Sequence, residues 1–373
     1  MKALQMQSCV HENATVECAL VEITLPDPGP EEVLVAVEAA PINPSDLGLM
    51  FGAADLSSAR EVERNGQPAV LLDVPAAAMR AMAPRVGHWM AVGNEGSGRV
   101  VAAGDGEAAQ ALLGQRVGMF GGEMYAAYRC LPASQCIAFP DTISAEQAAS
   151  CFVNPMTALG FAETARMENQ KAIIHLAAAS NLGQMLVKIC LEDNLPLVNI
   201  VRRAEHVDLL KDLGAEHVVN SSADDFMDQL RGAIDATDAY CGFDPIGGGS
   251  NVDACFKAME QVAANKMAEF SRYGSTQEKK MYIYGRLDLA PTVLTPSYGF
   301  GWTLSGWLLT PFLQTAGMDT MARMRQRVLD GMTTTFASSY KSKVNLDEML
   351  TRDAVLDYRQ MKTGEKYLVT PQA

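Results

Sequence analysis

The sequence lacks the features that mark a metal site built from neighbouring residues. None of its eight cysteines forms a Cys-x-x-Cys pair, and its five histidines show no His-x-x-x-His or His-Glu-x-x-His spacing. No apolar run reaches the roughly 18 residues of a membrane-spanning helix. The N-terminus also lacks the apolar stretch of a secretory signal. These absences predict a cytoplasmic protein with no metal motif and no membrane anchor.

Basic charge is also scarce. The chain has 30 Lys and Arg against 44 Asp and Glu, which gives a formal net charge of −14. Such an acidic chain repels phosphate backbones and anionic lipids, so neither nucleic acid nor a membrane is expected as a partner. With 373 residues, of which 48% are hydrophobic, the chain is globular and long enough for two domains. Most of the cysteines are expected to be reduced and buried.

The first 140 residues have a pattern of short strands and turns that is typical of a small antiparallel barrel. The expected strands are 16–26, 33–39, 98–104, 115–120 and 123–130. An insertion from Ala53 to His88 contains the Ala- and Met-rich stretch Asp73–Arg85. We expect a short helix there, capped by Asp73 and with Pro75 near its first turn.

After Pro140, strands and helices alternate, which predicts a parallel, doubly wound sheet. The expected strands are Ala172–Ala177, Leu197–Val201, His217–Asn220, Ala239–Asp244, Met281–Gly285 and Thr303–Leu309. The first helix between them has one apolar face, formed by Leu182, Met185, Leu186, Ile189 and Cys190. Gly214 is expected to end the second helix. The chain closes with a helix, a turn at Gly364 and a strand.

The stretch HLAAASNLGQM (175–185) stands where a dinucleotide-binding fold has its Gly-x-Gly-x-x-Gly turn. Only Gly183 is present, and Ala178 and Ser180 occupy the two other glycine positions. Small residues, helical N–H groups and the polar side chains of Ser180 and Asn181 still suit a phosphate. Ser180 or Asn181 could also simply cap the helix.

Arg202 and Arg203 follow the second strand of the sheet, and Arg203 lies twenty residues beyond Gly183. An NAD-binding fold has Asp or Glu at this place for the ribose hydroxyl, whereas arginine suits the 2′-phosphate of NADPH. The two residues could instead be a solvated basic pair. Together with the preceding turn, they favour NADPH.

Seven stretches, taken in order, resemble the medium-chain dehydrogenase/reductase superfamily. They are APINPSD (40–46), VGNEGSGRVV (92–101), GQRVGMF (114–120), VNPMTALG (153–160), AAASNLGQM (177–185), DLGAEHVVN (212–220) and TGEKYLVTP (363–371). The resemblance implies an α/β protein in which a GroES-like β-barrel domain (1–140 and 335–373) flanks a Rossmann NADP-binding domain (141–334). It further implies an active cleft between the domains.

The resemblance also implies a homodimer, because the last Rossmann strand often pairs across a two-fold axis in this superfamily. In this chain that strand lies in the aromatic segment 298–312, for which we expect a buried strand and a dimer contact. Phe300 and Trp302 could instead line the substrate cleft.

Zinc-dependent members of the superfamily carry Cys-His-Ser/Thr-Asp and Gly-His-Glu. Here the corresponding stretches are Asn43-Pro44-Ser45-Asp46 and Gly93-Asn94-Glu95. Because neutral amides cannot replace a thiolate and an imidazole around Zn²⁺, no metal is expected. The chain therefore resembles the zinc-free branch, whose quinone oxidoreductases and 2-enoyl-thioester reductases reduce quinones or activated alkenes with NADPH.

Each motif acquires a role from this resemblance. The catalytic candidates are Asn43, Ser45 and Asp46. The cofactor-binding candidates are Thr157, Ser180, Asn181, Leu182, Gly183, Arg202, Arg203, Pro245, Tyr284 and Gly285. Enoyl reductases of this type usually have a Tyr soon after Asn-Pro-Ser-Asp, which is proposed to supply the proton. Residues 48–58, GLMFGAADLSS, contain none, so the donor is expected to be Ser45, Asp46 or solvent.

The expected function is NADPH-dependent hydride transfer, without zinc, to a quinone or an activated alkene or carbonyl as small-molecule substrate. Three alternatives stay open at this point: an enoyl-thioester reductase with a relocated proton donor, an idle NADPH-binding sensor or structural protein, and a zinc alcohol dehydrogenase. The residues do not identify the substrate itself.

Overall fold

The structure, a computed structural model, describes residues 1–358 and 366–372 and divides into two compact units. Unit 1 comprises Met1–Val153 and Arg327–Ala373, and unit 2 comprises Asn154–Gln326. These joints lie at other residues than the boundaries predicted after 140 and before 335, and the second joint falls inside a helix. The expected turn at Gly364 lies outside the described residues.

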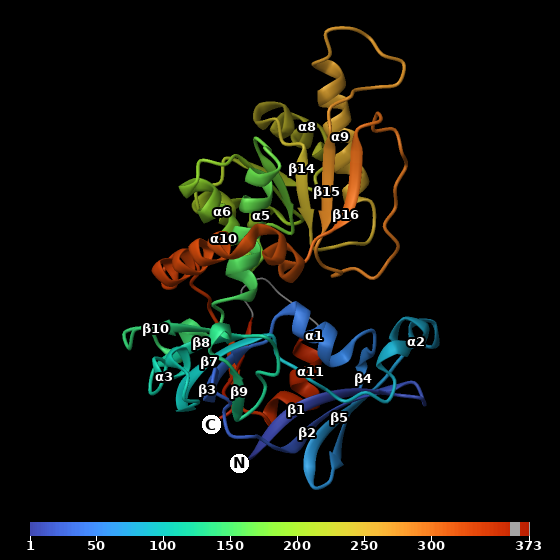
Figure 1. Cartoon of the computed structure of the whole chain (residues 1–373). Helices are drawn as coiled ribbons and strands as arrows, with labels where there is room; N and C mark the ends of the chain where they lie inside the picture. The colour runs from blue at the N-terminus through green and yellow to red at the C-terminus, as the bar shows by residue number, and fades with distance from the viewer. Residues whose placement is uncertain (359–365, 373) are drawn as a thin grey trace. The chain divides into compact units, whose positions relative to one another are not determined.

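Unit 1 forms two sheets in its described residues, and most of their strand pairs are antiparallel (Figure 1). The first has the order β4-β5-β2-β1-β6, with β1 (Lys2–His11), β2 (Thr15–Thr24), β4 (Asp55–Arg64), β5 (Gln67–Asp73) and β6 (Met90–Ala91). The second has the order β10-β8-β7-β3-β18-β17, with β9 also paired to β3. Its strands are β3 (Glu32–Pro41), β7 (Glu95–Ala103), β8 (Arg116–Phe120), β9 (Tyr128–Pro132), β10 (Cys136–Phe139), β17 (Ser342–Val344) and β18 (Tyr367–Val369).

Short helices connect these strands. They are α1 (Pro44–Phe51), α2 (Ala76–Met82), α3 (Glu107–Gln110), α4 (Ala145–Ala148) and α11 (Arg352–Tyr358), with 3₁₀ turns η1 (Ala83–Arg85), η2 (Ala133–Gln135) and η3 (Glu348–Leu350). Apolar side chains from both sheets, including Met6, Val35 and Leu72, form the core of the unit together with Met50 and Phe51 of α1. Helix α1, which carries the predicted catalytic residues, is therefore anchored by its buried face.

The insertion at 53–88 contains a β-hairpin that was not expected from the sequence. Strands β4 and β5 are joined by Asn65 and Gly66, which both have positive φ, as a two-residue type I′ turn requires. The expected cap at Asp73 is wrong. Asp73 ends β5, and its carboxylate forms a bidentate ion pair with Arg60. Helix α2 begins only after Pro75.

The end of the insertion holds α1 in place. The Arg85 guanidinium donates hydrogen bonds to the carbonyl oxygens of Gly48 and Leu49, at 3.2 and 2.5 Å, and to the Ser8 hydroxyl at 3.3 Å. Carbonyl groups in the last turn of a helix have no intrahelical donor, and a cation there interacts favourably with the helix dipole. The insertion thus extends the first sheet and caps the helix that carries the catalytic candidates.

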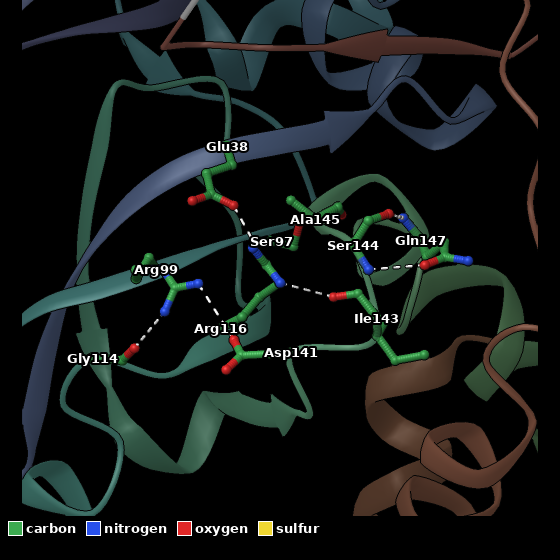
Figure 2. A network of polar contacts seen from close by, with 10 residues as sticks. All are labelled: Glu38, Ser97, Arg99, Gly114, Arg116, Asp141, Ile143, Ser144, Ala145 and Gln147. Atoms are coloured by element: carbon green, nitrogen blue, oxygen red, sulfur yellow. Dashed lines mark hydrogen bonds and ion pairs between the residues drawn. The ribbon is translucent and has the colours of Figure 1, made fainter.

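The segment before the joint is tied to the strands of the second sheet (Figure 2). Arg116 donates to the carbonyl of Ile143 at 3.0 Å and lies 3.6 Å from a Glu38 carboxylate oxygen. The Ser97 hydroxyl donates to the carbonyl of Ala145, and a reciprocal Ser144–Gln147 capping box starts α4. These contacts explain why 141–153 belong to unit 1. At the other joint, residues 327–334 start within α10 (Leu309–Gly331), which runs across the boundary.

Unit 2 contains a parallel sheet with the order β13-β12-β11-β14-β15-β16. Its strands are β11 (Ile173–Leu176), β12 (Leu197–Val201), β13 (His217–Asn220), β14 (Cys241–Asp244), β15 (Lys279–Ile283) and β16 (Trp302–Gly306). Its helices are α5 (Val153–Met167), which begins at the last residue of unit 1, α6 (Asn181–Glu192), α7 (Ala204–Asp212), α8 (Phe226–Thr237), α9 (Asn251–Asn265) and α10. This strand order is that of the doubly wound Rossmann fold, so the predicted fold class is confirmed.

Helices cover both faces of this sheet. Ile174 and Val198 on one face pack with residues of α8 and α9 in a single core. On the other face, Phe161 of α5 stacks on Phe243 at 4.1 Å between ring centroids. Gly214 follows α7 with positive φ, as expected for a residue that ends a helix. All eight cysteines are buried, as expected for most of them.

The expectation of a buried strand in 298–312 is wrong for the single chain. Strand β16 is the outermost strand of the sheet, Thr303 and Ser305 are exposed, and Phe300 is 78% exposed. The homodimer stays a prediction. Among the described helices, none has both the length and the apolar character that crossing a membrane requires.

We expect Arg85→Met to lower the free energy of unfolding by about 2 kcal/mol, because it leaves carbonyl groups at the end of α1 without a charged donor. Urea unfolding checks the value. Arg80→Met is the matched control, since Arg80 is exposed in α2 and has no polar partner among the described residues. Equal stabilities of the two variants would contradict the bracing role of Arg85.

Candidate cofactor and substrate sites

The strand order of unit 2 changes direction between β11 and β14, which are neighbours although two strands separate them in the chain. In open α/β sheets, ligands bind at the carboxyl ends of the strands at such a switch point. The turn 177–183 leaves β11 there, and Pro245 follows β14 at the same edge. The topology thus brings two of the predicted cofactor motifs together.

The geometry of the turn after β11 explains its composition. Ser180 is the N-cap of α6, and its hydroxyl oxygen accepts a hydrogen bond from the Gly183 N–H at 3.2 Å. A Cβ atom on Gly183 would lie only 2.1 Å from the carbonyl oxygen of Ala178, so only glycine fits. Ala177, one residue before the first glycine position, has a positive φ of 51°, a conformation that glycine adopts more easily.

The capping role of Ser180 and a phosphate-binding role of the turn are compatible. The hydroxyl of Ser180 accepts from Gly183 and keeps its own proton as a donor. N–H groups in the first turn of α6, from Asn181 to Gly183, lie at the positive end of the helix dipole. The turn therefore has the donor chemistry that a pyrophosphate requires.

The two arginines after β12 differ in their surroundings. Arg203 lies 3.0 Å from a Glu205 carboxylate oxygen, and its guanidinium is 2.7 Å from Nε2 of His206. Burial and the nearby Arg203 lower the pKa of His206. Arg202 is exposed and has no polar contact within the described part of the chain. Arg202 is thus the more available cation at this strand end.

Four further predicted residues lie in α5 or directly after β14 and β15. A Cβ on Gly285 would meet the Pro245 carbonyl oxygen at 2.7 Å, so the two backbones approach closely. Thr157 is buried in α5. The Tyr284 hydroxyl lies 2.8 Å from Nε2 of His175, a fully buried residue whose pKa falls to about 3 through burial. The Tyr284 hydroxyl is therefore paired with a neutral imidazole.

In unit 1, the carboxylate of Asp46 joins the start of α1 to the segment before β7. It accepts a hydrogen bond from the backbone N–H of Asn43 and another from that of Asn94, each at 2.8 Å. Asp46 is fully buried, and burial raises its pKa to about 7, with Glu95 adding to the rise and Lys366 opposing it. Asp46 thus has a structural role and no exposed surface.

Glu95 joins α1 to the start of α5. One carboxylate oxygen accepts from Nδ2 of Asn43 at 3.0 Å, and the other accepts from the N–H groups of Phe152 and Val153 at 2.8 Å each. Lys366 supplies a positive charge in the same region and donates to the Ser150 hydroxyl at 2.8 Å, and burial lowers its pKa. Asn43 and Glu95 are both buried.

Ser45 is the only exposed member of the three catalytic candidates. Its hydroxyl oxygen accepts a hydrogen bond from Nδ2 of Asn94 at 3.0 Å. The side chains at the positions of the zinc ligands thus bind protein groups: Asn43 binds Glu95, and Asn94 binds Ser45. In the described residues, no group of three or more His, Cys, Asp or Glu side chains could hold a metal ion.

The predicted site residues do not include Glu95, His175 or Lys366. Glu95 and His175 each carried a signal, because a polar residue stands there in a run of small or apolar residues that forms a buried strand. For Lys366, no local signal existed, since its partner Ser150 lies more than two hundred residues earlier in the chain.

Comparisons with known proteins agree with this architecture. Residues 29–173 match the alcohol dehydrogenase GroES-like domain. A Mesorhizobium loti protein assigned as an NADPH:quinone reductase has a similar structure, with a TM-score of 0.73, 26% identity, and coverage of 100% of this chain and 98% of its own. Escherichia coli quinone oxidoreductase, solved with NADPH, has the same fold, with a TM-score of 0.67 and 16% identity over 100% of both chains.

Mitochondrial enoyl-[acyl-carrier-protein] reductase from Bos taurus is 30% identical over 202 residues, which cover 51% of this chain and 45% of that protein. The match thus spans about half the length of that reductase, and the Caenorhabditis elegans enzyme is matched over 49% of its length. A GroES-like domain combined with a Rossmann domain defines a two-domain dehydrogenase architecture. By its fold and by these matches, the chain is similar to the medium-chain dehydrogenase/reductase superfamily, in its quinone oxidoreductase and enoyl reductase-like branch.

Asp46 predicts a specific pH dependence of stability. Its pKa of about 7 in the folded chain exceeds the value of about 3.9 expected after unfolding. Between about pH 4 and pH 7, the folded state binds one proton more than the unfolded state. The contribution of Asp46 to the free energy of unfolding is therefore complete below about pH 4 and is lost as the pH rises through about 7. From pH 5 to pH 8, this group should lower the free energy of unfolding by about 2 kcal/mol.

Urea unfolding of the wild type and Asp46→Asn at pH 5 and pH 8 measures this effect. The Asn variant should lack that part of the pH dependence, whatever its constant loss of stability. Asp105→Asn, which changes an exposed carboxylate of the same unit, should keep it. The same pH dependence in all three proteins would contradict a raised pKa at Asp46.

Proposed function

We propose that this protein is an NADPH-dependent, zinc-independent oxidoreductase that reduces a quinone or an activated alkene or carbonyl. The observation that carries the proposal is the carboxyl edge of the unit 2 sheet at its switch point. There, a small-residue turn with an N-capped helix meets the close backbone approach of Pro245 and Gly285. Dinucleotide cofactors bind at such an edge in doubly wound folds.

The residues at this edge fit NADPH. The N–H groups at the start of α6 and the Ser180 hydroxyl suit the pyrophosphate, and Gly183 lets the helix start pack closely on the backbone of Ala178. The exposed guanidinium of Arg202 suits the 2′-phosphate. When bound, NADPH supplies a hydride from its nicotinamide ring. The protein orients the cofactor and substrate and provides hydrogen-bond donors for the charge that develops on the substrate.

The donor set in unit 1 supports a reaction without zinc. Thiolate and imidazole ligands are replaced by Asn43 and Asn94, and their amide groups hold Glu95 and Ser45. Glu95 itself already accepts three hydrogen bonds, so its carboxylate is committed. The chemistry of this set is therefore that of positioning and hydrogen bonding, and not that of a Lewis acid.

A quinone suits this arrangement better than an enoyl thioester. The segment where enoyl reductases have their Tyr contains Phe51, which is 1% exposed. Asp46 is buried and bonded to two N–H groups, and the Tyr284 hydroxyl is paired with His175. A reduced quinone needs no such acid, because its oxygen takes a proton from water.

Arg202→Ala is expected to weaken NADPH binding about tenfold or more and to leave NADH binding unchanged, since it removes a charged donor to the 2′-phosphate. Arg203→Ala should have a smaller effect, because Glu205 already neutralises Arg203. Fluorescence titration with both cofactors measures these constants, and Lys211→Ala controls for the loss of one positive charge in α7. Unchanged selectivity in Arg202→Ala would contradict the proposed phosphate contact.

A substrate panel tests the activity. We expect NADPH oxidation, followed at its absorbance band, with quinones and more slowly or not at all with enoyl thioesters. The purified protein should keep full activity after dialysis against a chelator. Tight NADPH binding without turnover of any quinone, enal or enoyl thioester would instead identify a sensor, and stoichiometric zinc lost together with activity would identify a zinc enzyme.

A further inference from the structure

The pair formed by Ser45 and Asn94 lies at the exposed end of the buried network in unit 1. Nδ2 of Asn94 donates to Oγ of Ser45 at 3.0 Å. A hydroxyl that accepts one hydrogen bond still has its own proton to donate. Because the amide occupies one lone pair of Oγ, the Ser45 proton is directed away from Asn94.

The backbone of Asn94 is fixed by the buried network of unit 1. Its backbone N–H donates to Asp46, which also accepts from the backbone of Asn43. The next residue, Glu95, is buried and bonded to the start of α5. The amide of Asn94 therefore extends from a fixed backbone, and Ser45 lies on α1, whose last turn Arg85 braces.

We propose that Asn94 is a positioning residue that orients the Ser45 hydroxyl as a hydrogen-bond donor to the reacting oxygen of the substrate. This inference rests on the proposed reductase function. It gives Asn94 a positive role, whereas its sequence position marks it only as the replacement for a zinc ligand. As the substrate gains negative charge on its oxygen, Ser45 shares its proton in a hydrogen bond and keeps it. The proton that finally binds to the product oxygen comes from water, so Ser45 ends unchanged.

The amide donor also strengthens the hydroxyl. A hydroxyl that accepts a hydrogen bond becomes a better donor, because the two bonds polarise one another. A single donor aimed at a developing oxyanion contributes about a hundredfold or more to the rate in enzymes where it has been removed. Ser45 is exposed, so we expect a smaller effect, of about tenfold.

Asn94→Asp is the most informative variant, because it keeps the shape of the side chain and reverses its polarity. An aspartate oxygen would accept the Ser45 proton, which would then no longer face the substrate. The backbone N–H of residue 94 would still bind Asp46. Ser45→Ala and the double variant Ser45→Ala/Asn94→Asp complete a thermodynamic cycle, and Ser57→Ala, at an exposed serine of the same unit that is bonded to Asp55, serves as control.

Two readouts follow these variants. The first is binding of p-nitrophenolate, an oxyanion probe, to the protein with no substrate present, measured by the shift of its absorbance. The second is kcat for a benzoquinone, with the NADPH dissociation constant and the melting temperature measured alongside. We expect Ser45→Ala and Asn94→Asp each to lose about tenfold in phenolate affinity and in kcat, with NADPH binding unchanged. The double variant should be no worse than Ser45→Ala, because both changes remove one interaction.

Several results would overturn the inference. These are the absence of measurable phenolate binding to the wild type, wild-type affinity in Asn94→Asp, or additive losses in the double variant, which would point to a general effect of the new charge. If the wild type turns over quinones and Ser45→Ala is unchanged, the reductase function stands and the inference fails. If no substrate is turned over but phenolate affinity follows the expected pattern, the proposed reaction fails, while the oriented donor is supported.

Discussion

Two buried carboxylates, those of Asp46 and Glu95, control the local structure on which the candidate catalytic residues depend. A carboxylate that leaves water must replace its lost hydrogen bonds, and here backbone N–H groups and one amide supply them. The start of α1, the segment before β7 and the start of α5 are therefore held together by acceptors. Ser45 and the side chain of Asn94, at the edge of this network, are left to form the polar surface of the site.

At the candidate nucleotide site of unit 2, the protein supplies hydrogen-bond donors, whereas the buried carboxylates of unit 1 are acceptors. At the switch point of the unit 2 sheet, the N–H groups of a helix start and a capping hydroxyl are hydrogen-bond donors, while Gly183 permits the backbone contact with Ala178. Of the three usual glycine positions, only that of Gly183 leaves no room for a Cβ, since Ala178 does not take a positive φ and Ser180 caps the helix. Losing two glycines of a dinucleotide motif is thus compatible with keeping its donors.

The sequence predictions were correct where local residue patterns decide the structure, and they failed where contacts between distant residues decide it. Strands β12 and β13 lie at the predicted residues, because apolar runs flanked by helices identify buried parallel strands. The β4–β5 hairpin was not predicted, because its polar alternation is weak and its Asn-Gly turn was the one clear signal. Asp73 was misassigned, since a capping residue and a strand end paired with Arg60 have the same local composition.

The sequence by itself determined the resemblance to the superfamily, the two kinds of domain, the parallel sheet implied by alternating strands and helices, and the loss of thiolate and imidazole at the zinc positions. These follow from periodicity and from residue types, which are local properties. Only the tertiary structure decided which polar groups meet. The Asn94–Ser45 pair, the pairing of Tyr284 with His175, the carboxylate of Glu95 on the first N–H groups of α5 and the bracing of α1 by Arg85 all join residues far apart in the chain. Their partners were fixed by burial, because each desolvated polar group had to find whichever donor or acceptor the fold brought within reach.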